Sequence, residues 1–250
     1  MPQLAVLRVG EDPATASYLR QISRAFAGHR LLASSVTLPA DSGQDTVAEA
    51  LAGLAVDPTI HGILLQLPLP AGLRSEPLLE AIPLEKDVEG LHPYHVGQLA
   101  LGRPSFVPST PLAGLEILRR SAVELSGRVA VVVGRSPVVG RPMASLLVQA
   151  DCTVLTCHTR TVDLGSFARQ ADVLVAAAGR PGLIRGEMLK PGAVVIDFGT
   201  NELEGRLVGD ADFASASAVA SAITPVPGGT GPVTTAVLGR NLVRATRAQV

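Results

Sequence analysis

The chain has 250 residues, of which 47% are hydrophobic, and its formal net charge at neutral pH is −1. This length indicates one large domain or two small ones, and the near-zero charge argues against a nucleic acid or an anionic membrane as partner. Two cysteines are too few for a disulfide framework or a four-ligand zinc site, so no metal is expected. With no signal-peptide pattern at the start, the sequence predicts a cytoplasmic protein with no membrane span.

Short apolar runs alternate with helical patterns along the chain, which is typical of α/β proteins with parallel strands. The first half predicts strands over 4–9, 32–38 and 62–66, helices over 14–26, 46–54 and 75–81, and a loop over 86–93. A helix over 110–120 leads to the second half. There the pattern predicts strands over 128–133, 153–157, 173–177 and 193–197, and helices over 141–148, 164–170 and 233–247.

A turn with glycines at both ends, Gly134–Gly140, lies between a predicted strand and a predicted helix. A phosphate-binding strand–turn–helix needs this context. Gly134 allows the tight turn and Gly140 allows the helix to pack closely on the sheet. Because Ser136 stands where the fingerprint has its middle glycine, an ordinary βα turn remains an alternative.

The next predicted strand ends in His158–Thr161, without the acidic residue that usually holds the ribose hydroxyls of NAD. Arg160 and Arg135 instead suit the 2′-phosphate of NADP, although Arg160 as a solvated loop residue is the alternative. Two more turns, 178–182 and 197–201, follow predicted strands. We expect them to face one cleft, because ligands of open α/β sheets bind at the carboxyl ends of the strands.

The segment 224–232 holds three prolines and three glycines in nine residues and carries no charge. Such a segment forms neither a regular helix nor a central strand. It predicts a backbone held in one shape, with glycine N–H groups and a helix start directed at a ligand. A rigid turn between domains is the alternative.

Five motifs occur together and in order: 9–18 (VGEDPATASY), 66–70 (QLPLP), 86–93 (KDVEGLHP), 134–142 (GRSPVVGRP) and 224–232 (TPVPGGTGP). Over essentially the whole chain, this set resembles the bifunctional methylenetetrahydrofolate dehydrogenase/methenyltetrahydrofolate cyclohydrolase family. The resemblance implies two α/β domains flanking a cleft, the second Rossmann-like. Residues 1–109 and 232–250 would form the folate-binding catalytic domain and residues 110–231 the NADP-binding domain, with a homodimer formed through the latter.

The resemblance also implies an activity in one-carbon metabolism: oxidation of 5,10-methylenetetrahydrofolate by NADP, then hydrolysis of the methenyl product to 10-formyltetrahydrofolate. It makes Tyr18, Gln66 and Glu89 the catalytic and substrate-binding residues, with Tyr18 stacked on the aminobenzoyl ring. Further implied folate contacts are Pro225, Gly228 and Gly229, and implied NADP contacts are Gly134, Arg135, Ser136, Thr159 and Thr200. Tyr18 as an ordinary helix-face aromatic and Gln66 as a strand-end hydrogen-bonding residue are the alternatives.

The sequence departs from the family pattern at two candidate catalytic positions. The family has Tyr-x-x-x-Lys in the first helix. Here the residue four positions after Tyr18 is Ile22, and an aliphatic side chain cannot transfer a proton. Arg20 and Arg24 lie off this helix face, and arginine is not a neutral base. Glu89 stands where the family usually has Asp, and its carboxylate can still accept a paired hydrogen bond from a pterin amide edge.

These departures predict weak or absent cyclohydrolase activity and surviving dehydrogenase activity, because hydride transfer depends mainly on position and on the cofactor. Two other functions stay open. One is a dehydrogenase with a different substrate on the same scaffold. The other is a non-catalytic folate- or NADP-binding paralogue, which the complete set of cofactor turns disfavours.

Overall fold

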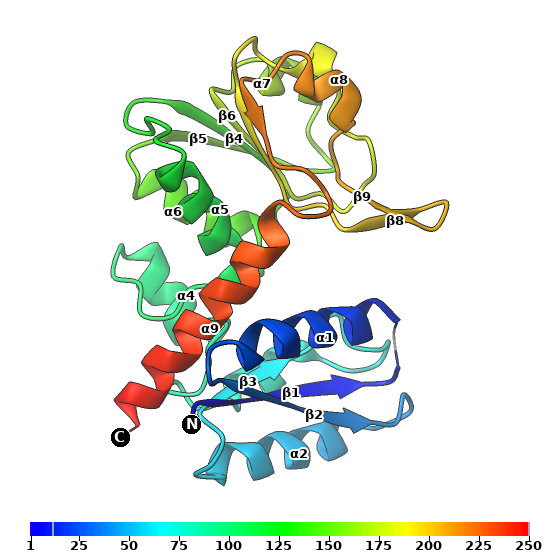
Figure 1. Cartoon of the computed structure of the whole chain (residues 1–250), viewed down its shortest axis with the longest axis vertical. Coiled ribbons are helices and arrows are strands. Elements are labelled where there is room, and N and C mark those ends of the chain that lie inside the picture. The colour runs from blue at the N-terminus through cyan, green and yellow to red at the C-terminus, as the bar shows by residue number, and fades with distance from the viewer. Residues whose placement is uncertain (12, 250) are drawn as a thin grey trace. The chain divides into compact units, whose positions relative to one another are not determined.

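The computed structural model describes residues 1–11 and 13–249, with backbone alone for 13–17. The chain divides into two compact units: a first domain of Met1–Val107 and Thr235–Val250, and a second domain of Pro108–Thr234. The sequence placed these boundaries at 109/110 and 231/232. In Figure 1 the first domain carries the blue and cyan segments and the red helix, and the second carries green to orange.

The first domain is built on a parallel three-stranded sheet in the order β2-β1-β3. The strands are β1 (Gln3–Val9), β2 (Leu32–Leu38) and β3 (Gly62–Leu65). Helices α1 (Pro13–Ala27) and α2 (Gln44–Val56) cover opposite faces of this sheet (Figure 1). Successive side chains of β1 point to opposite faces of the sheet. Leu4 and Val6 pack in the core on the α1 face, and Ala5 and Leu7 pack in the core on the α2 face.

Three further helices belong wholly or partly to this domain: α3 (Ser75–Glu80), α4 (Pro93–Ala100) and the long α9 (Thr230–Ala248). The sequence did not predict α4, because Tyr94 and Val96 are exposed and no apolar stripe marks the helix. Its start is fixed locally instead. The Nδ1 atom of His92 accepts the backbone N–H of Tyr94, and Pro93 occupies the first helical position.

Helix α9 begins at Thr230, three residues before the predicted start at 233. The last part of the proline- and glycine-rich segment is therefore helical, which corrects the expectation that none of 224–232 forms a helix. Pro232 is tolerated because it is the third residue of the helix, and N–H groups of the first turn have no intrahelical partner.

The second domain contains a parallel five-stranded sheet in the order β10-β7-β6-β4-β5. Its strands are β4 (Val129–Val133), β5 (Thr153–Cys157), β6 (Val173–Ala176), β7 (Val194–Asp197) and β10 (Ala222–Ile223). Counted along the chain, the spatial order is 2-1-3-4-5. The strand order therefore reverses between β4 and β6, and such a switch point is where doubly wound sheets bind ligands.

Helices cover both faces of this sheet: α5 (Ser109–Arg120) and α6 (Gly140–Val148) on one, α7 (Leu164–Ala168) and α8 (Phe213–Ser217) on the other (Figure 1). Gly114 lets α5 approach closely, because a Cβ there would lie 2.4 Å from Cζ of Phe198. The prediction of two α/β domains, the second Rossmann-like, is confirmed. In the described part of the chain, no helix is long and apolar enough to cross a membrane.

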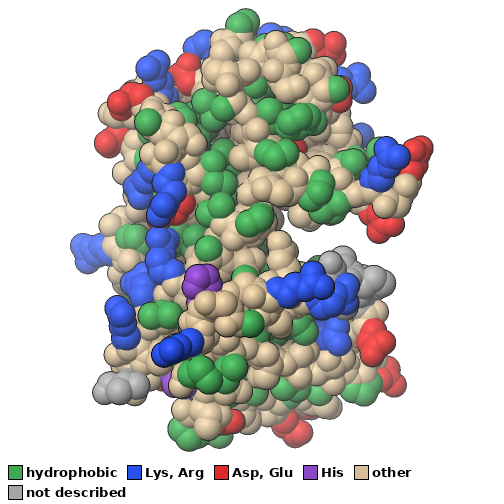
Figure 2. All heavy atoms as spheres, in the orientation of Figure 1, with side chains coloured by type: hydrophobic (Ala, Val, Ile, Leu, Met, Phe, Trp, Pro, Cys, Tyr) green, Lys and Arg blue, Asp and Glu red, His purple; other side chains and the backbone are tan. Residues whose placement is uncertain are grey.

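An antiparallel hairpin, β8 (Asn201–Leu203) and β9 (Arg206–Val208), projects from the second domain (Figure 1). The sequence did not predict it, because its strands have three residues each, too few to show a period. Leu203 and Leu207 are 52% and 45% exposed. Figure 2 shows charged side chains gathered at the tip of this hairpin.

Candidate active site

Residues predicted to contact NADP, together with the predicted folate contact Pro225, lie at the carboxyl edge of the second-domain sheet. Gly134 directly follows β4, Thr159 follows β5, Thr200 follows β7, and Pro225 follows β10. All these strands are parallel, so their carboxyl ends share one edge. The backbone alone therefore brings these four positions to the same side of the sheet.

The turn after β4 is compressed against the neighbouring strand end at the switch point. Gly134 has φ +137°, and a Cβ there would lie 2.0 Å from the carbonyl oxygen of Ala177. A Cβ on Gly140 would lie 2.2 Å from the oxygen of Gly134. Only glycine fits at both positions, which gives a cradle of bare backbone at the start of α6. This cradle fits the pyrophosphate of a dinucleotide.

The polar side chains at this edge of the sheet differ in what they can contact. Ser136 Oγ accepts the N–H groups of Val139 at 3.1 Å and Gly140 at 3.4 Å, so it shapes the turn. Arg135 and Thr159 are exposed, as are Arg160 and Thr200. These exposed side chains are free to meet a ligand at the edge, whereas the hydroxyl of Ser136 is engaged by the backbone.

The loop after β6 is already occupied by a carboxyl group of the protein itself. The carboxyl group of Asp210, which is fully buried, accepts the N–H groups of Ala178, Gly179 and Arg180 and the side-chain amide of Asn201. Three successive N–H groups form the kind of concavity that binds phosphate. Because Asp210 fills this concavity, it is not open to the phosphate of a ligand. Sequence reasoning missed Asp210, since no spacing distinguishes it from a surface acid.

A second buried carboxyl group, Asp197, ties the neighbouring loops together. It accepts the N–H groups of Gly199, Asp210 and Ala211. Burial raises its pKa, and the nearby Asp210 raises it further, while the three hydrogen bonds act in the opposite direction. Asp197 thereby links the end of β7 to the residues that follow the hairpin.

The backbone of Asp197 also forms hydrogen bonds with the proline- and glycine-rich segment 224–232 at two points. Its N–H donates to Oγ1 of Thr224 at 2.8 Å, and its carbonyl accepts the hydroxyl of Thr230 at 3.4 Å. Between these points the N–H of Gly229 donates to the oxygen of Pro225, and Gly228 has φ +97°. The segment is a closed turn anchored at the carboxyl edge, with the Val226–Pro227 peptide bond cis.

In the first domain, the three predicted catalytic residues also lie toward one sheet edge. Gln66 directly follows β3, and its Nε2 donates to the oxygen of Leu67 at 3.1 Å. Asp87 pairs with Ile63 of β3 in parallel register, so Glu89, two residues later, reaches the same end. Burial, and then the charge of Glu89, raise the pKa of Tyr18, so these two side chains lie within electrostatic reach of each other. Gln66 and Glu89 share one end of β3.

Ile22, at the family's lysine position, is fully buried in the domain core. It packs in one cluster with Phe26, Val88 and Leu238, and the half-buried Tyr18 packs against that cluster. Arg20, Gln21 and Arg24 are exposed. The helix face that carries Tyr18 therefore continues into apolar core where the family pattern has an amine.

The other two charged residues of the 86–93 motif support the loop. Lys86 is 6% exposed, and its Nζ donates to the carbonyls of Leu54, Ala55 and Asp57 at the end of α2. This contact caps a helix C-terminus with a cation. Asp87 Oδ2 accepts the N–H of His92 at 2.8 Å. Both side chains hold the motif in place and leave Glu89 as its candidate ligand-binding carboxylate.

A cavity of about 730 Å³ lies in the second domain beside the hairpin and the start of α8. Its walls include Asp197 and Val226, but not Gly134, Ser136 or Thr159. The cavity is therefore lined by other residues than the glycine cradle. Within the described residues, no group of three or more His, Cys, Asp or Glu side chains is arranged to hold a metal ion.

A glycine cradle at the switch point of a parallel sheet defines a dinucleotide-binding α/β protein. Two family models give the class more closely: residues 1–89 match "Tetrahydrofolate dehydrogenase/cyclohydrolase, catalytic domain" and residues 108–250 match its "NAD(P)-binding domain". The chain belongs to the tetrahydrofolate dehydrogenase/cyclohydrolase family. The family resemblance seen in the sequence is confirmed.

Individual members of this family are similar to the chain over its full length. The chain is 53% identical to the bifunctional protein FolD of Chloroflexus aurantiacus, covering 100% of this chain and 88% of that protein. Among solved structures, it is similar to the bifunctional FolD enzyme of Campylobacter jejuni, with 41% identity, a TM-score of 0.96, and coverage of 100% and 89%. The Trypanosoma brucei enzyme, solved with NADP and an inhibitor, shares 39% identity with a TM-score of 0.95, over 99% and 87% of the two chains.

Proposed function

We propose that this protein oxidises 5,10-methylenetetrahydrofolate to 5,10-methenyltetrahydrofolate with NADP, as a dehydrogenase of one-carbon metabolism. The observation that carries the proposal is the glycine cradle in the second domain, combined with Tyr18, Gln66 and Glu89 in the first. Family membership over both domains supports the same reaction.

In the second domain, the turn between Gly134 and Gly140 holds the pyrophosphate at the start of α6, where the two glycines let the phosphates approach the backbone. Ser136 keeps the turn in shape. Arg135 and Thr159 reach the adenosine side, and the absence of an acidic residue directly after β5 favours the 2′-phosphate of NADP over NAD. Thr200 contacts the cofactor from the end of β7. When bound, NADP supplies the hydride acceptor.

In the first domain, Tyr18 stacks on the aminobenzoyl ring and Glu89 accepts a paired hydrogen bond from the amide edge of the pterin. Gln66 lies near the reacting carbon. The anchored turn with Pro225, Gly228 and Gly229 contributes backbone contacts near nicotinamide and pterin. The Tyr18 hydroxyl is protonated in the neutral range, as tyrosine ordinarily is, and its raised pKa keeps it a hydrogen-bond donor at higher pH as well.

Hydrolysis of the methenyl product is weak or absent in this protein. Water attack needs a group that manages protons, and Ile22 fills that position with an aliphatic side chain packed in the core. Hydride transfer needs no such group and depends on the relative position of substrate and cofactor.

Two further properties belong to the proposal. The protein forms a homodimer through its second domain, supported by the exposed apolar side chains Leu203, Leu207 and Phe213. It works in the cytoplasm, supported by two cysteines that are buried and unpaired. Sedimentation equilibrium tests the first statement, and fractionation of cells producing the protein tests the second.

The activity is tested by following NADPH formation with purified protein and 5,10-methylenetetrahydrofolate, with NAD in a parallel reaction. The expected result is turnover with NADP and much slower turnover with NAD. Binding of both ligands without turnover would favour a non-catalytic paralogue. Failure to bind the folate, with NADP binding intact, would favour a dehydrogenase for another substrate.

A further inference from the structure

Asn241 is a fully buried amide within the apolar core of the first domain. It lies on α9 beside Leu238, Leu242 and Ala245, which are also fully buried. Its Nδ2 donates to the backbone carbonyl of Val88 at 2.9 Å and to that of Val107 at 3.2 Å. One side chain therefore joins α9 to two loops that are far apart in the sequence.

Burying the Asn241 amide costs free energy of folding, because one of its atoms has no hydrogen-bond partner. Among the described residues, Asn241 Oδ1 is the one buried side-chain oxygen or nitrogen without a hydrogen-bond partner. A buried acceptor without a partner loses its hydration and gains nothing in return. Turning the amide over would point Oδ1 at two carbonyl oxygens, so the observed orientation is the better one. A leucine of similar size would remove this cost, but it would leave the carbonyls of Val88 and Val107 without the donor that they now share. The amide therefore contributes two hydrogen bonds that hold the segments at Val88 and Val107.

The contacts show what the amide holds in place. Val88 directly precedes Glu89, and Gly90 follows with φ +64°. A Cβ on Gly90 would lie 2.6 Å from the carbonyl oxygen of Phe106, so the turn at 88–90 presses directly on the segment that Asn241 also binds. Lys86 and Asp87 fix the chain before the turn. The hydrogen bond to Val88 fixes it immediately before Glu89.

We propose that Asn241 is a positioning residue for folate binding, because it sets the place and direction of the Glu89 carboxylate through the backbone of Val88. This inference rests on the proposed function of Glu89 as the pterin-binding carboxylate. Asn241 itself is buried and acts only through the turn, so its loss should weaken folate binding and leave NADP binding unchanged.

The test compares Asn241→Leu with Ala245→Gly, a control on the same helix that loosens the core without touching the turn. For Asn241→Leu we expect the KM for 5,10-methylenetetrahydrofolate to rise about tenfold, with the KM for NADP within about twofold of the parent protein. We also expect faster amide hydrogen exchange in the peptide over 86–91. Ala245→Gly should lower the melting temperature and leave both KM values within about twofold.

Asn241→Ser, which retains one hydrogen-bond donor, is the alternative variant if Asn241→Leu does not fold. Its KM for the folate should lie between the values of the parent protein and the leucine variant. A folded variant with unchanged folate KM and unchanged exchange over 86–91 would overturn the inference. Equal rises in both KM values, matched by the glycine control, would also overturn it. Lack of folate-dependent NADP reduction by the parent protein would instead contradict the proposed function.

Discussion

Ile22 lies one helical turn after Tyr18 on the same face of α1, fully buried, in one core cluster with Val88 next to the Glu89 turn. Side chains on a helix lean toward its N-terminus, so a lysine at this position would direct its amine toward Tyr18. At this position of α1 the side chain therefore contributes to the hydrophobic core, whereas a lysine in the family pattern would contribute to proton transfer. Burial of such an aliphatic side chain contributes about 1.5–3 kcal/mol to folding.

Replacing Ile22 with lysine should restore hydrolysis. We expect methenyltetrahydrofolate hydrolysis to rise on the order of 10²-fold, the usual contribution of a positioned acid–base group. The melting temperature should fall, because a charge enters an apolar site. Ile22→Met is the matched control, since it has a long flexible side chain without an amine. Equal hydrolysis by the lysine and methionine variants would exclude Ile22 as the cause of weak hydrolysis.

Gly134→Ala should abolish NADP binding, because the added Cβ would collide with the carbonyl of Ala177 inside the cradle. Gly192→Ala is the control: Gly192 also has a positive φ of +83°, but no atom lies within 4 Å of an added Cβ. The control should lose about 1–2 kcal/mol of stability from backbone strain and keep its NADP affinity. Fluorescence titration with NADPH measures the affinity. Tight NADPH binding by Gly134→Ala would place the cofactor elsewhere.

Asp210→Asn should loosen the cofactor edge. An amide offers one acceptor where the carboxyl group now serves four donors, and its NH₂ group faces N–H groups. We expect a loss of about 2–4 kcal/mol in the free energy of unfolding and weaker NADP binding. The control Asp212→Asn changes an exposed carboxyl group that accepts from Ser215. Urea unfolding of both variants measures this loss, and equal losses would show that the four hydrogen bonds to the Asp210 carboxyl group are not its source.

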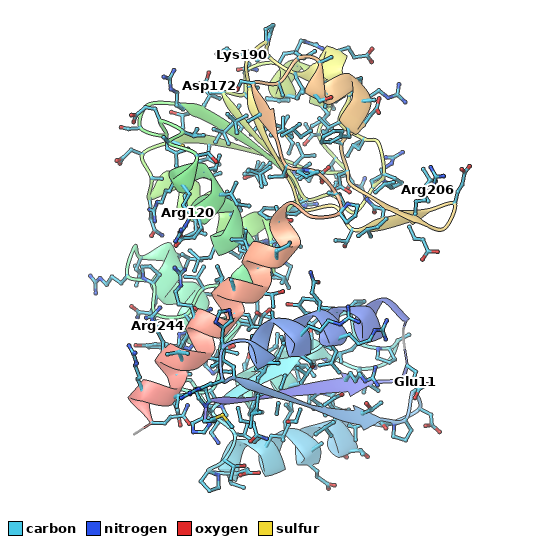
Figure 3. All side chains as sticks on the ribbon, viewed as in Figure 1. Glu11, Arg120, Asp172, Lys190, Arg206 and Arg244 are labelled. Atoms are coloured by element: carbon cyan, nitrogen blue, oxygen red, sulfur yellow. The ribbon has the colours of Figure 1, made fainter. Side chains whose placement is uncertain are left out.

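Asp172 should stabilise the fold in a pH-dependent way. It lies beside Lys190 where β6 begins (Figure 3), with Oδ1 2.6 Å from Nζ. The hydrogen bond from Lys190, and then that from the N–H of Val129, lower its pKa. A lowered pKa gives stability that is present above the unfolded value of about 3.9 and is lost as the pH falls through the folded value.

We therefore expect Asp172→Asn to cost about 1 kcal/mol at neutral pH, a figure typical of solvent-accessible ion pairs. The difference from the parent protein should shrink as the pH falls below about 4. Unfolding by urea at several pH values measures it, and Lys190→Gln should remove part of the same difference. A difference that stays constant down to pH 2 would mean that the ion pair is not its source.

The sequence allowed the parallel sheets, the cofactor turns and the family to be predicted, because long apolar runs and five ordered motifs carry that information. It did not reveal the hairpin β8–β9 or helix α4, whose residues lack a period. The tasks of Asp210 and Lys86 were also missed, since both depend on backbone groups distant in the sequence. Asn241 did leave a signal: a polar residue on the apolar stripe of α9 with Leu238 and Ala245.

The most direct test of the account is the ratio of two rates measured on one preparation of the unmodified protein. One is NADP-dependent oxidation of 5,10-methylenetetrahydrofolate, and the other is hydrolysis of 5,10-methenyltetrahydrofolate. We predict clear dehydrogenase turnover, with hydrolysis at or only slightly above the rate of the spontaneous reaction in buffer, because the buried Ile22 side chain can neither donate nor accept a proton. Enzymatic hydrolysis at a rate comparable to the oxidation would contradict it.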